Sequence, residues 1–323
     1  MTSIIITGGT GLIGNALGKA LLEKGYHVII MSRKPVDKPI TGNLRYAAWN
    51  VEQQTIDKEA IGSADYIIHL AGAGVAEKRW TKKRKQEIIS SRVESSKLIT
   101  DSLKTISNKV KAVISSSAIG WYLTPNPSPS RKGGREGKGL RKFVESDPPA
   151  NDFLGTTCQQ WEESIEPVTQ SGIRLVKLRI GIVLSREGGA LKEFLKPLRF
   201  GIASILGSGK QIISWIHIDD LVSMFIAAIE DDKMNGVYNA VAPNPVSNKE
   251  LIMKLAKARK KFYIPFYVPS FILKLLLGEM SNEVLKSATV SCDKVQKTGF
   301  TFQFPDIYSA FADLLKQEDH PVN

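Results

Sequence analysis

Cysteine and histidine are scarce in this sequence. Its 323 residues include two cysteines, Cys158 and Cys292, and four histidines. The cysteines lie far apart without the spacing of metal ligands, and the histidines are scattered along the chain. These observations exclude a disulfide-rich scaffold, give no indication of a metal cluster and favour a reducing compartment.

Long apolar runs are also lacking. The N-terminal run stops at Gly8, which is too early for a signal peptide. The run over residues 262–277 contains Pro265, Pro269 and Lys274, and it falls short of the roughly 20 residues that a membrane-spanning helix needs. We therefore expect a cytoplasmic protein with no membrane partner. A lipid-facing role for residues 262–277 is the alternative.

Acidic residues are outnumbered, since 44 Lys and Arg against 32 Asp and Glu give a net charge of +12. Part of the surplus lies within residues 123–142, which are rich in proline, glycine, serine and basic residues. Such a composition cannot build a packed core, so we expect a mobile basic insertion on the surface. It also lacks interleaved aromatic residues. We therefore expect no specific nucleic-acid partner, and at most a weak, salt-sensitive attraction to polyanions.

Glycines at three-residue spacing follow the first apolar run. Gly8, Gly11 and Gly14 come directly after Ile4–Ile6, and an apolar helical pattern follows them. Gly8 permits a tight turn, Gly11 lets the backbone approach a diphosphate, and Gly14 lets the helix pack closely on the strand. The pattern predicts a dinucleotide site, with an ordinary glycine-rich turn as the alternative. The candidate cofactor-binding residues of this loop are Gly8, Thr10, Gly11, Leu12, Ile13 and Gly14.

The end of the second expected strand indicates which dinucleotide binds. This strand covers residues 26–31 and is followed by Ser32, Arg33 and Lys34, where an NAD-selective chain usually has a carboxylate for the ribose 2′-hydroxyl. The guanidinium of Arg33 and the ammonium of Lys34 suit the 2′-phosphate of NADP(H) instead. A solvated strand end is the alternative interpretation.

Strand-like and helix-like patterns alternate through the first part of the chain. Strands are expected over residues 64–72, 110–117 and 174–184, and helices over 81–103 and 152–170. This alternation predicts a Rossmann-type α/β fold with a doubly wound parallel sheet, whose ligands bind beyond the carboxyl ends of the strands. We divide the chain into an NADP(H)-binding domain, residues 1–188, and a smaller substrate-side lobe, residues 189–323, which includes a C-terminal helical domain over about 262–316.

Several further motifs make the chain resemble the extended short-chain dehydrogenases/reductases. More narrowly, it resembles their epimerase-like subfamily, the NAD-dependent epimerase/dehydratases with a short C-terminal domain of unknown function. The most specific motifs lie at residues 70–74 with 79–81, 91–92, 161–162, 215–220 and 269–310. The resemblance implies that the cofactor is also contacted by Leu70, Ala71, Gly72, Glu87, Arg92 and Val183. The basic insertion departs from the subfamily pattern.

The catalytic residues of the resembled family are only partly present. Hydride-transferring members use a Tyr-x-x-x-Lys pair, and alignment on the Trp-Glu motif at 161–162 places Leu154 and Cys158 at those positions. A cysteine on an apolar helix face is usually a packing residue. Ser117 matches the serine that polarises the substrate carbonyl. Tyr122 is the nearest phenol that could replace the missing acid, with packing as its alternative role.

Three classes of function follow. The first is an NADP(H)-dependent oxidoreductase or epimerase with an unknown small-molecule substrate, acting through Ser117 and Tyr122. The second is an NADP(H)-binding sensor or partner-binding protein that has lost the Tyr/Lys pair. The third is an interaction protein acting through the basic insertion. We favour the first, as a monomer or homodimer. His217, which precedes an expected helix, is predicted to fix that junction rather than to act as a base.

Overall fold

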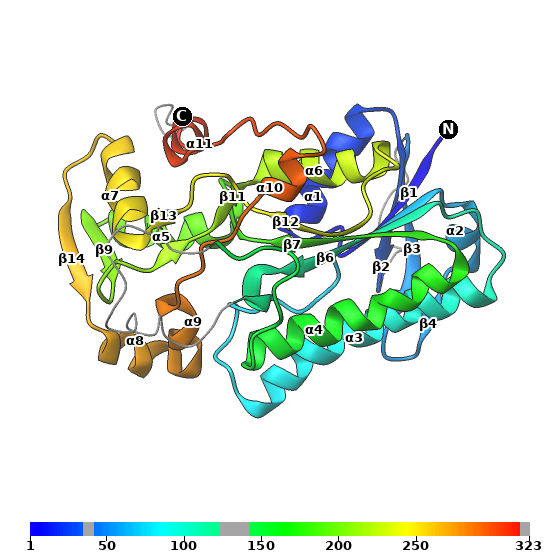
Figure 1. Cartoon of the computed structure of the whole chain (residues 1–323), viewed down its shortest axis with the longest axis horizontal. Coiled ribbons are helices and arrows are strands. Elements are labelled where there is room, and N and C mark those ends of the chain that lie inside the picture. The colour runs from blue at the N-terminus through cyan, green and yellow to red at the C-terminus, as the bar shows by residue number, and fades with distance from the viewer. Residues whose placement is uncertain (35–41, 123–141, 317–323) are drawn as a thin grey trace. The chain divides into compact units, whose positions relative to one another are not determined.

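The structure, a computed structural model, describes residues 1–34, 42–122 and 142–316 (Figure 1). These residues form two compact units whose segments interleave along the chain. Unit 1 comprises residues 1–118, 156–179 and 221–238, and unit 2 comprises residues 119–155, 180–220 and 239 onward. The single boundary expected between residues 188 and 189 stays a prediction. The expected basic insertion falls almost entirely on residues 123–141, outside the described residues.

An eight-stranded sheet organises unit 1. Its strands are, from edge to edge, β12 (Gly236–Ala240), β7 (Arg174–Ile180), β6 (Ala112–Ala118), β5 (Tyr66–His69), β1 (Ser3–Thr7), β2 (His27–Ser32), β3 (Leu44–Asn50) and β4 (Thr55–Ile56). The neighbours from β6 through β5, β1 and β2 to β3 pair in parallel, and β4 pairs antiparallel with β3. This arrangement confirms the predicted Rossmann-type α/β fold.

Helices cover both faces of this sheet, which explains why its central strands are apolar at consecutive positions. The helical segments of unit 1 are α1 (Leu12–Glu23), α2 (Lys58–Ser63), α3 (Lys82–Thr105), most of α4 (Phe153–Ile165), a 3₁₀ turn (Glu166–Ser171) and most of α6 (Ile218–Glu230). Figure 1 shows α3 and α4 side by side along one face, with α1 and α6 on the other. Ile5, Ile29 and Ile67 face the cluster that contains Leu98 and Leu103 of α3.

Unit 2 is built from short elements around a second apolar core. Its strands pair two by two, as β8 (Ile182–Ser185) with β11 (Trp215–His217), β9 (Ile202–Leu206) with β14 (Ile264–Val268), and β10 (Ile212–Ile213) with β13 (Val246–Ser247). Its helices are α5 (Gly189–Leu198), α7 (Asn248–Ala258), α8 (Ser270–Leu277), α9 (Ser281–Leu285), α10 (Asp293–Gln296) and α11 (Ile307–Leu314), with 3₁₀ turns at Ile119–Trp121 and Gly278–Met280. Trp215, Leu251 and Phe311 are buried together in its core.

None of the described helices combines the length and the apolar character that crossing a bilayer requires.

Candidate cofactor site in unit 1

The loop between β1 and α1 has the shape that its glycines predict. Gly8 adopts a φ of +69°, and a Cβ built on it lies 2.9 Å from the carbonyl carbon of Leu70. A Cβ on Gly14 lies 2.5 Å from the carbonyl oxygen of Gly8. A side chain at either position therefore forces the loop away from β5 or α1 away from the loop. The Gly11 amide closes the turn by donating to the Gly8 carbonyl, 3.0 Å away.

The N-terminus of α1 carries a partial positive charge that no acidic side chain of its first turn compensates. Its N-cap residue is Gly11, which has no side chain to accept from the free amides, and the first turn holds no acidic residue. Backbone amides and the helix dipole at such a terminus attract anions. Thr10 and Gly11 are exposed, and Leu12 and Ile13 are half-buried. The loop thus presents an anion-binding surface to solvent.

Two cations stand at the end of β2. Arg33 and Lys34 follow the last strand residue, Ser32, and both are exposed. The Lys34 amide donates to the Ser32 hydroxyl at 3.2 Å, which fixes the backbone just past the strand. Within residues 1–34, 42–122 and 142–316, no carboxylate forms an ion pair with either side chain. Both cations are therefore available to an anion from outside this part of the chain.

A buried hydrogen-bond chain holds the end of β5, where Leu70 and Ala71 lie. Their amides donate to the hydroxyl oxygen of Thr7 at 3.2 and 3.3 Å. Thr7 Oγ1 lies 2.7 Å from Nδ1 of His69, whose Nε2 lies 3.1 Å from the Ser96 hydroxyl. Because the Thr7 oxygen accepts two amides, its proton goes to His69 Nδ1, and the imidazole carries its own proton on Nε2. The chain ties the predicted cofactor-contacting segment to α3.

His69 makes the folded protein sensitive to acid. Burial, with a smaller contribution from the charge on Arg92, lowers the pKa of His69 to about 3. The unfolded chain binds this proton below about pH 6.5, so stability falls as the pH drops from 6.5 towards 3.

We expect the free energy of unfolding of His69→Gln to fall less steeply with acid than that of the wild type, by about 1.4 kcal/mol per pH unit. Urea unfolding between pH 7 and 4.5 measures this difference. His27→Gln, in the half-buried start of β2, is the control. An unchanged pH slope in His69→Gln contradicts the assignment.

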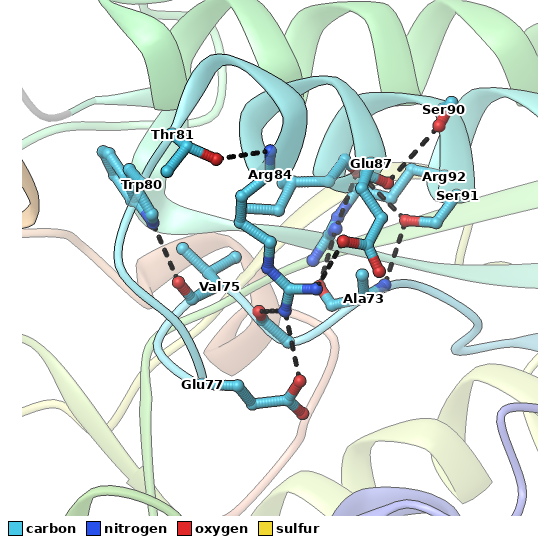
Figure 2. A network of polar contacts seen from close by, with 12 residues as sticks. Ala73, Val75, Glu77, Trp80, Thr81, Arg84, Glu87, Ser90, Ser91 and Arg92 are labelled. Carbon is cyan, nitrogen blue, oxygen red and sulfur yellow. Dashed lines mark hydrogen bonds and ion pairs between the residues drawn. The ribbon is translucent and has the colours of Figure 1, made fainter.

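Two arginines of α3 hold the loop that follows β5 (Figure 2). Arg84, whose side chain is almost fully buried, donates to the Gly74 carbonyl at 2.5 Å and to the Glu77 carboxylate at 3.1 Å. Arg92 donates to the carbonyl of Ala73 at 3.0 Å, and its guanidinium lies 3.1 Å from where a Cβ on Gly72 would stand. The long side chains of Arg84 and Arg92 therefore reach from α3 to the backbone of this loop and hold it in place.

The resemblance also singled out Glu87, Arg92 and Val183 as cofactor contacts. Glu87 is exposed and lies 2.8 Å from Nη1 of Arg84, whose hydrogen bond holds the pKa of the Glu87 carboxyl below its usual value. The Arg92 guanidinium lies 4.9 Å from the Trp161 ring, and burial lowers its pKa. Gly72 is exposed. Val183 belongs to β8 of unit 2, where it is half-buried beside Ile216. Their roles as cofactor contacts stay predictions.

Ser117 lies at the end of β6 and is engaged in a buried polar cluster. Its hydroxyl donates to Oε1 of Glu162 at 2.7 Å, and Arg179 donates to both carboxylate oxygens of Glu162, at 2.7 and 3.0 Å. All three residues are buried. A hydroxyl that donates its only proton to a carboxylate presents lone pairs on its remaining side, so Ser117 is arranged as an acceptor.

Tyr122 lies in unit 2, directly after the 3₁₀ turn that follows β6. Its hydroxyl donates to Oδ1 of Asn239 at 2.9 Å, and its ring stacks on Phe143 with centroids 5.3 Å apart. The side chain is buried, with 1% of the residue exposed. The packing role weighed for Tyr122 is therefore present in the structure, and its role as a proton donor stays a prediction.

The positions of the missing Tyr/Lys pair lie one turn apart in α4. Leu154 has no titratable group. The Cys158 thiol is buried and points to the Ala118 carbonyl, with a separation of 3.6 Å between Sγ and O. Burial raises the pKa of Cys158 to about 12, so it stays protonated and is a poor nucleophile. This geometry agrees with the packing role expected for Cys158.

His217 fixes the start of α6, as the sequence predicted. Its Nδ1 accepts from the Asp219 amide at 3.1 Å, and its ring stacks on Phe304. Together with Asp219 and Asp313 it forms a group of possible metal ligands. Arg186 already binds the Asp313 carboxylate at 3.0 Å, and burial lowers the pKa of His217. These contacts give the group of His217, Asp219 and Asp313 a structural role, in which it connects the start of α6 to α11.

Sequence reasoning missed the partners that hold this site together. Arg179 lies between Leu178 and Ile180 at a buried position of its strand, and a charge at a buried strand position requires a counter-charge. That signal predicts a buried acidic partner for Arg179, but the sequence alone does not separate Glu162 from its neighbours Glu163 and Glu166. Thr7 and His69, at the ends of two neighbouring parallel strands, carried a similar signal.

Known proteins match this chain along most of its length. The NAD dependent epimerase/dehydratase family matches residues 4–138, and a domain of unknown function, DUF1731, matches residues 268–314. Epimerase family protein SSP1921 of Staphylococcus saprophyticus is 34% identical over 315 residues, covering 98% of this chain and 100% of that protein. Epimerase family protein YfhF of Bacillus subtilis is 33% identical over 316 residues, covering 97% and 98%.

Solved structures share the same fold. The human epimerase family protein SDR39U1 (isoform 2), whose crystal structure was determined with NADPH, superposes with a TM-score of 0.83 at 26% identity, over 98% of this chain and 100% of that chain. UDP-glucuronic acid 4-epimerase of Bacillus cereus, determined with UDP-glucuronic acid and NAD, gives a TM-score of 0.77 at 19% identity, over 98% and 100%. At 19% identity, the similarity to the Bacillus cereus epimerase concerns the fold alone.

Proposed function

This chain belongs to the NAD-dependent epimerase/dehydratase family, and we propose that it is an NADP(H)-dependent oxidoreductase or epimerase that acts on a small molecule. The observation that carries the proposal is the loop from Gly8 to Gly14. It combines a tight glycine turn with a helix N-terminus that is free of acidic residues. The resemblance noted from the sequence, including the C-terminal domain of unknown function, is confirmed.

The cofactor preference rests on charge at two places in unit 1. The amides at the N-terminus of α1 suit the diphosphate, and Arg33 and Lys34 suit a 2′-phosphate at the end of β2. The human relative that this chain resembles along its whole length was crystallised with NADPH, which supports the same preference. A bound nicotinamide supplies the hydride acceptor or donor, and the protein residues orient it and exchange protons.

Replacing both cations at the end of β2 tests this assignment. We expect Arg33→Ala/Lys34→Ala to weaken NADPH binding by about tenfold or more, because charge-assisted hydrogen bonds to the 2′-phosphate are lost. NADH, which lacks that phosphate, is expected to bind nearly unchanged. Fluorescence titration measures both affinities. Lys97→Ala/Lys104→Ala, at exposed positions of α3, is the control for a general loss of positive charge. An equal loss for NADPH and NADH in the β2 variant contradicts the assignment.

The proton chemistry is assigned to Ser117 and Tyr122. In alcohol oxidation, the Ser117 oxygen accepts the substrate hydroxyl proton as its own proton passes to the Glu162 carboxylate, at 2.7 Å. A bound nicotinamide would supply the acceptor for the hydride that leaves the substrate carbon, so charge and atoms would balance. Tyr122 is the acid assigned in place of the missing pair, after exchanging its hydrogen bond with Asn239.

A second candidate is favoured by α4. Leu154 and Cys158 stand where a phenol and an ammonium are needed, and the Cys158 thiol is buried and protonated. A chain that binds NADP(H) without this pair is suited to act as a redox sensor or partner-binding protein. A screen of carbonyl and sugar-nucleotide substrates separates the two. Net NADPH consumption with a carbonyl substrate, or conversion of a sugar nucleotide to its epimer, identifies the enzyme. Tight binding without either conversion across the panel identifies the sensor.

A further inference from the structure

Unit 2 exposes an apolar face on its outermost strands. β14 pairs in parallel with β9, so that Ile264 lies beside Ile202. Ile264 and Phe266 alternate along β14 on the same side as Ile202, since Ala203 and Ile205 of β9 face the core. Phe200 and Phe262 lie two residues before the two strands begin, and both are more than 80% exposed. We call these five residues, Phe200, Ile202, Phe262, Ile264 and Phe266, the β9–β14 face.

The helix that follows β14 adds a second apolar surface (Figure 1). Phe271 and Leu275 of α8 lie one turn apart on one side of the helix and are 70% and 73% exposed, while Leu273 is buried. Lys274 lies beside Leu275 on the exposed side. Single exposed apolar residues are ordinary on a protein surface, but large ones grouped on adjoining elements mark a surface that contacts another phase or molecule.

Positive charge surrounds these apolar residues. Residues 251–278 contain six Lys or Arg and no acidic residue, and residues 194–218 contain three and none. Two of these nine cations, Lys254 and Lys196, form ion pairs with Glu250 and Glu193 outside the two ranges. Within the part of the chain that the structure describes, no carboxylate pairs with the exposed side chains of Arg199, Lys260, Lys261 or Lys274. Arg199 precedes Phe200, and Lys261 precedes Phe262, so the cations border the apolar face directly.

We propose that the β9–β14 face and α8 attach the protein peripherally to an anionic lipid bilayer. Exposed phenylalanine and leucine side chains enter the boundary between headgroups and acyl chains, and the surrounding cations bind the negative lipid headgroups. Charge complementarity favours this occupant over a second copy of the chain, because a symmetric contact would bring two unpaired clusters of cations together. The sequence favoured no membrane partner and left a lipid-facing role for residues 262–277 as the alternative, and the proposal takes up that alternative.

Vesicle sedimentation with the full chain tests the proposal. We expect the protein to sediment with phosphatidylcholine vesicles that contain about one-third phosphatidylglycerol, and to remain in the supernatant with vesicles of phosphatidylcholine alone. Bound protein is expected to fall several-fold when salt rises from about 0.1 M to 0.5 M, because the surface potential is screened. NADPH titration of the same preparation confirms that the cofactor site is intact.

Separate variants test the apolar and the charged contributions. Phe200→Ser/Phe262→Ser is expected to lower vesicle binding by at least about tenfold, with an unchanged melting temperature because both side chains are solvent-exposed. Lys260→Glu/Lys261→Glu is expected to have a similar effect. Lys82→Glu/Lys83→Glu, an exposed lysine pair at the start of α3, makes the same change of net charge elsewhere and is expected to retain at least half of the binding.

Three results would overturn the proposal. One is wild-type binding to anionic vesicles by the Phe200→Ser/Phe262→Ser variant, since the apolar face then makes no contact with lipid. Another is an equal loss of vesicle binding in the Lys82→Glu/Lys83→Glu control, because the attraction to lipid would then depend only on the net charge of the protein. The third is a wild-type dimer, seen by analytical ultracentrifugation, that the Phe200→Ser/Phe262→Ser variant dissociates, because a second copy then covers the face.

Discussion

Arg179→Met is expected to lower the free energy of unfolding by about 3–5 kcal/mol, because it leaves the Glu162 carboxylate buried without its counter-charge. The guanidinium makes two hydrogen bonds to this carboxylate, and both side chains are almost fully buried. Urea unfolding at pH 7 measures the change. A loss of that size is a large fraction of the stability of an ordinary domain.

Two further variants make this prediction specific. Glu162→Leu/Arg179→Met removes both charges and is expected to recover a large part of the loss, because no unpaired ion remains. Lys97→Met breaks an exposed ion pair with Glu94 and is expected to cost less than about 1 kcal/mol. If Arg179→Met costs no more than Lys97→Met, the buried pair does not hold Ser117 and α4 in place.

The second large effect concerns turnover, once a substrate is known from the screen. Ser117→Ala and Tyr122→Phe are each expected to lower kcat by around a hundredfold, the usual scale for a positioned proton donor or acceptor. NADPH affinity is expected to hold in both. Cys158→Ala is the matched control on α4, and it is expected to change kcat little because the thiol is buried and its pKa is raised to about 12.

The alternatives for this prediction are separable. Full activity in the Ser117→Ala/Tyr122→Phe double variant rejects these two residues as the proton-exchanging groups. Complete loss in Cys158→Ala, with the melting temperature unchanged, replaces them with a thiol mechanism. Since Ser117 donates to Glu162, the melting temperature of Ser117→Ala is measured as well, so that a packing defect is not counted as a catalytic one.

The cofactor half of the fold follows from local sequence patterns. The turn at Gly8, the close packing at Gly14 and the apolar strand Ile4–Ile6 are properties of a dozen consecutive residues, and the structure contains all of them. Strand β3 was missed, because its sequence mixes polar and small residues. The run 174–184 was expected as one strand, but it divides at Gly181 into β7 and β8.

The polar clusters could not be predicted, because they depend on pairs distant in sequence. Ser117 and Glu162 are brought together by the packing of α4 beside β6, and Thr7 meets His69 through the pairing of β1 with β5. The exposure of β14 could not be predicted either. The alternation of residues along a strand does not tell whether both of its sides are exposed, and the pairing with β9 is needed to show which residues of the two strands share a face.

Calorimetric titration of the wild-type chain with NADPH and with NADH is the most direct test of the central claim that unit 1 is an NADP(H) site. The account predicts one bound NADPH per chain, at an affinity about tenfold or more above that for NADH, because only NADPH carries the phosphate that Arg33 and Lys34 can bind. No binding of either dinucleotide, or tighter binding of NADH, would contradict it.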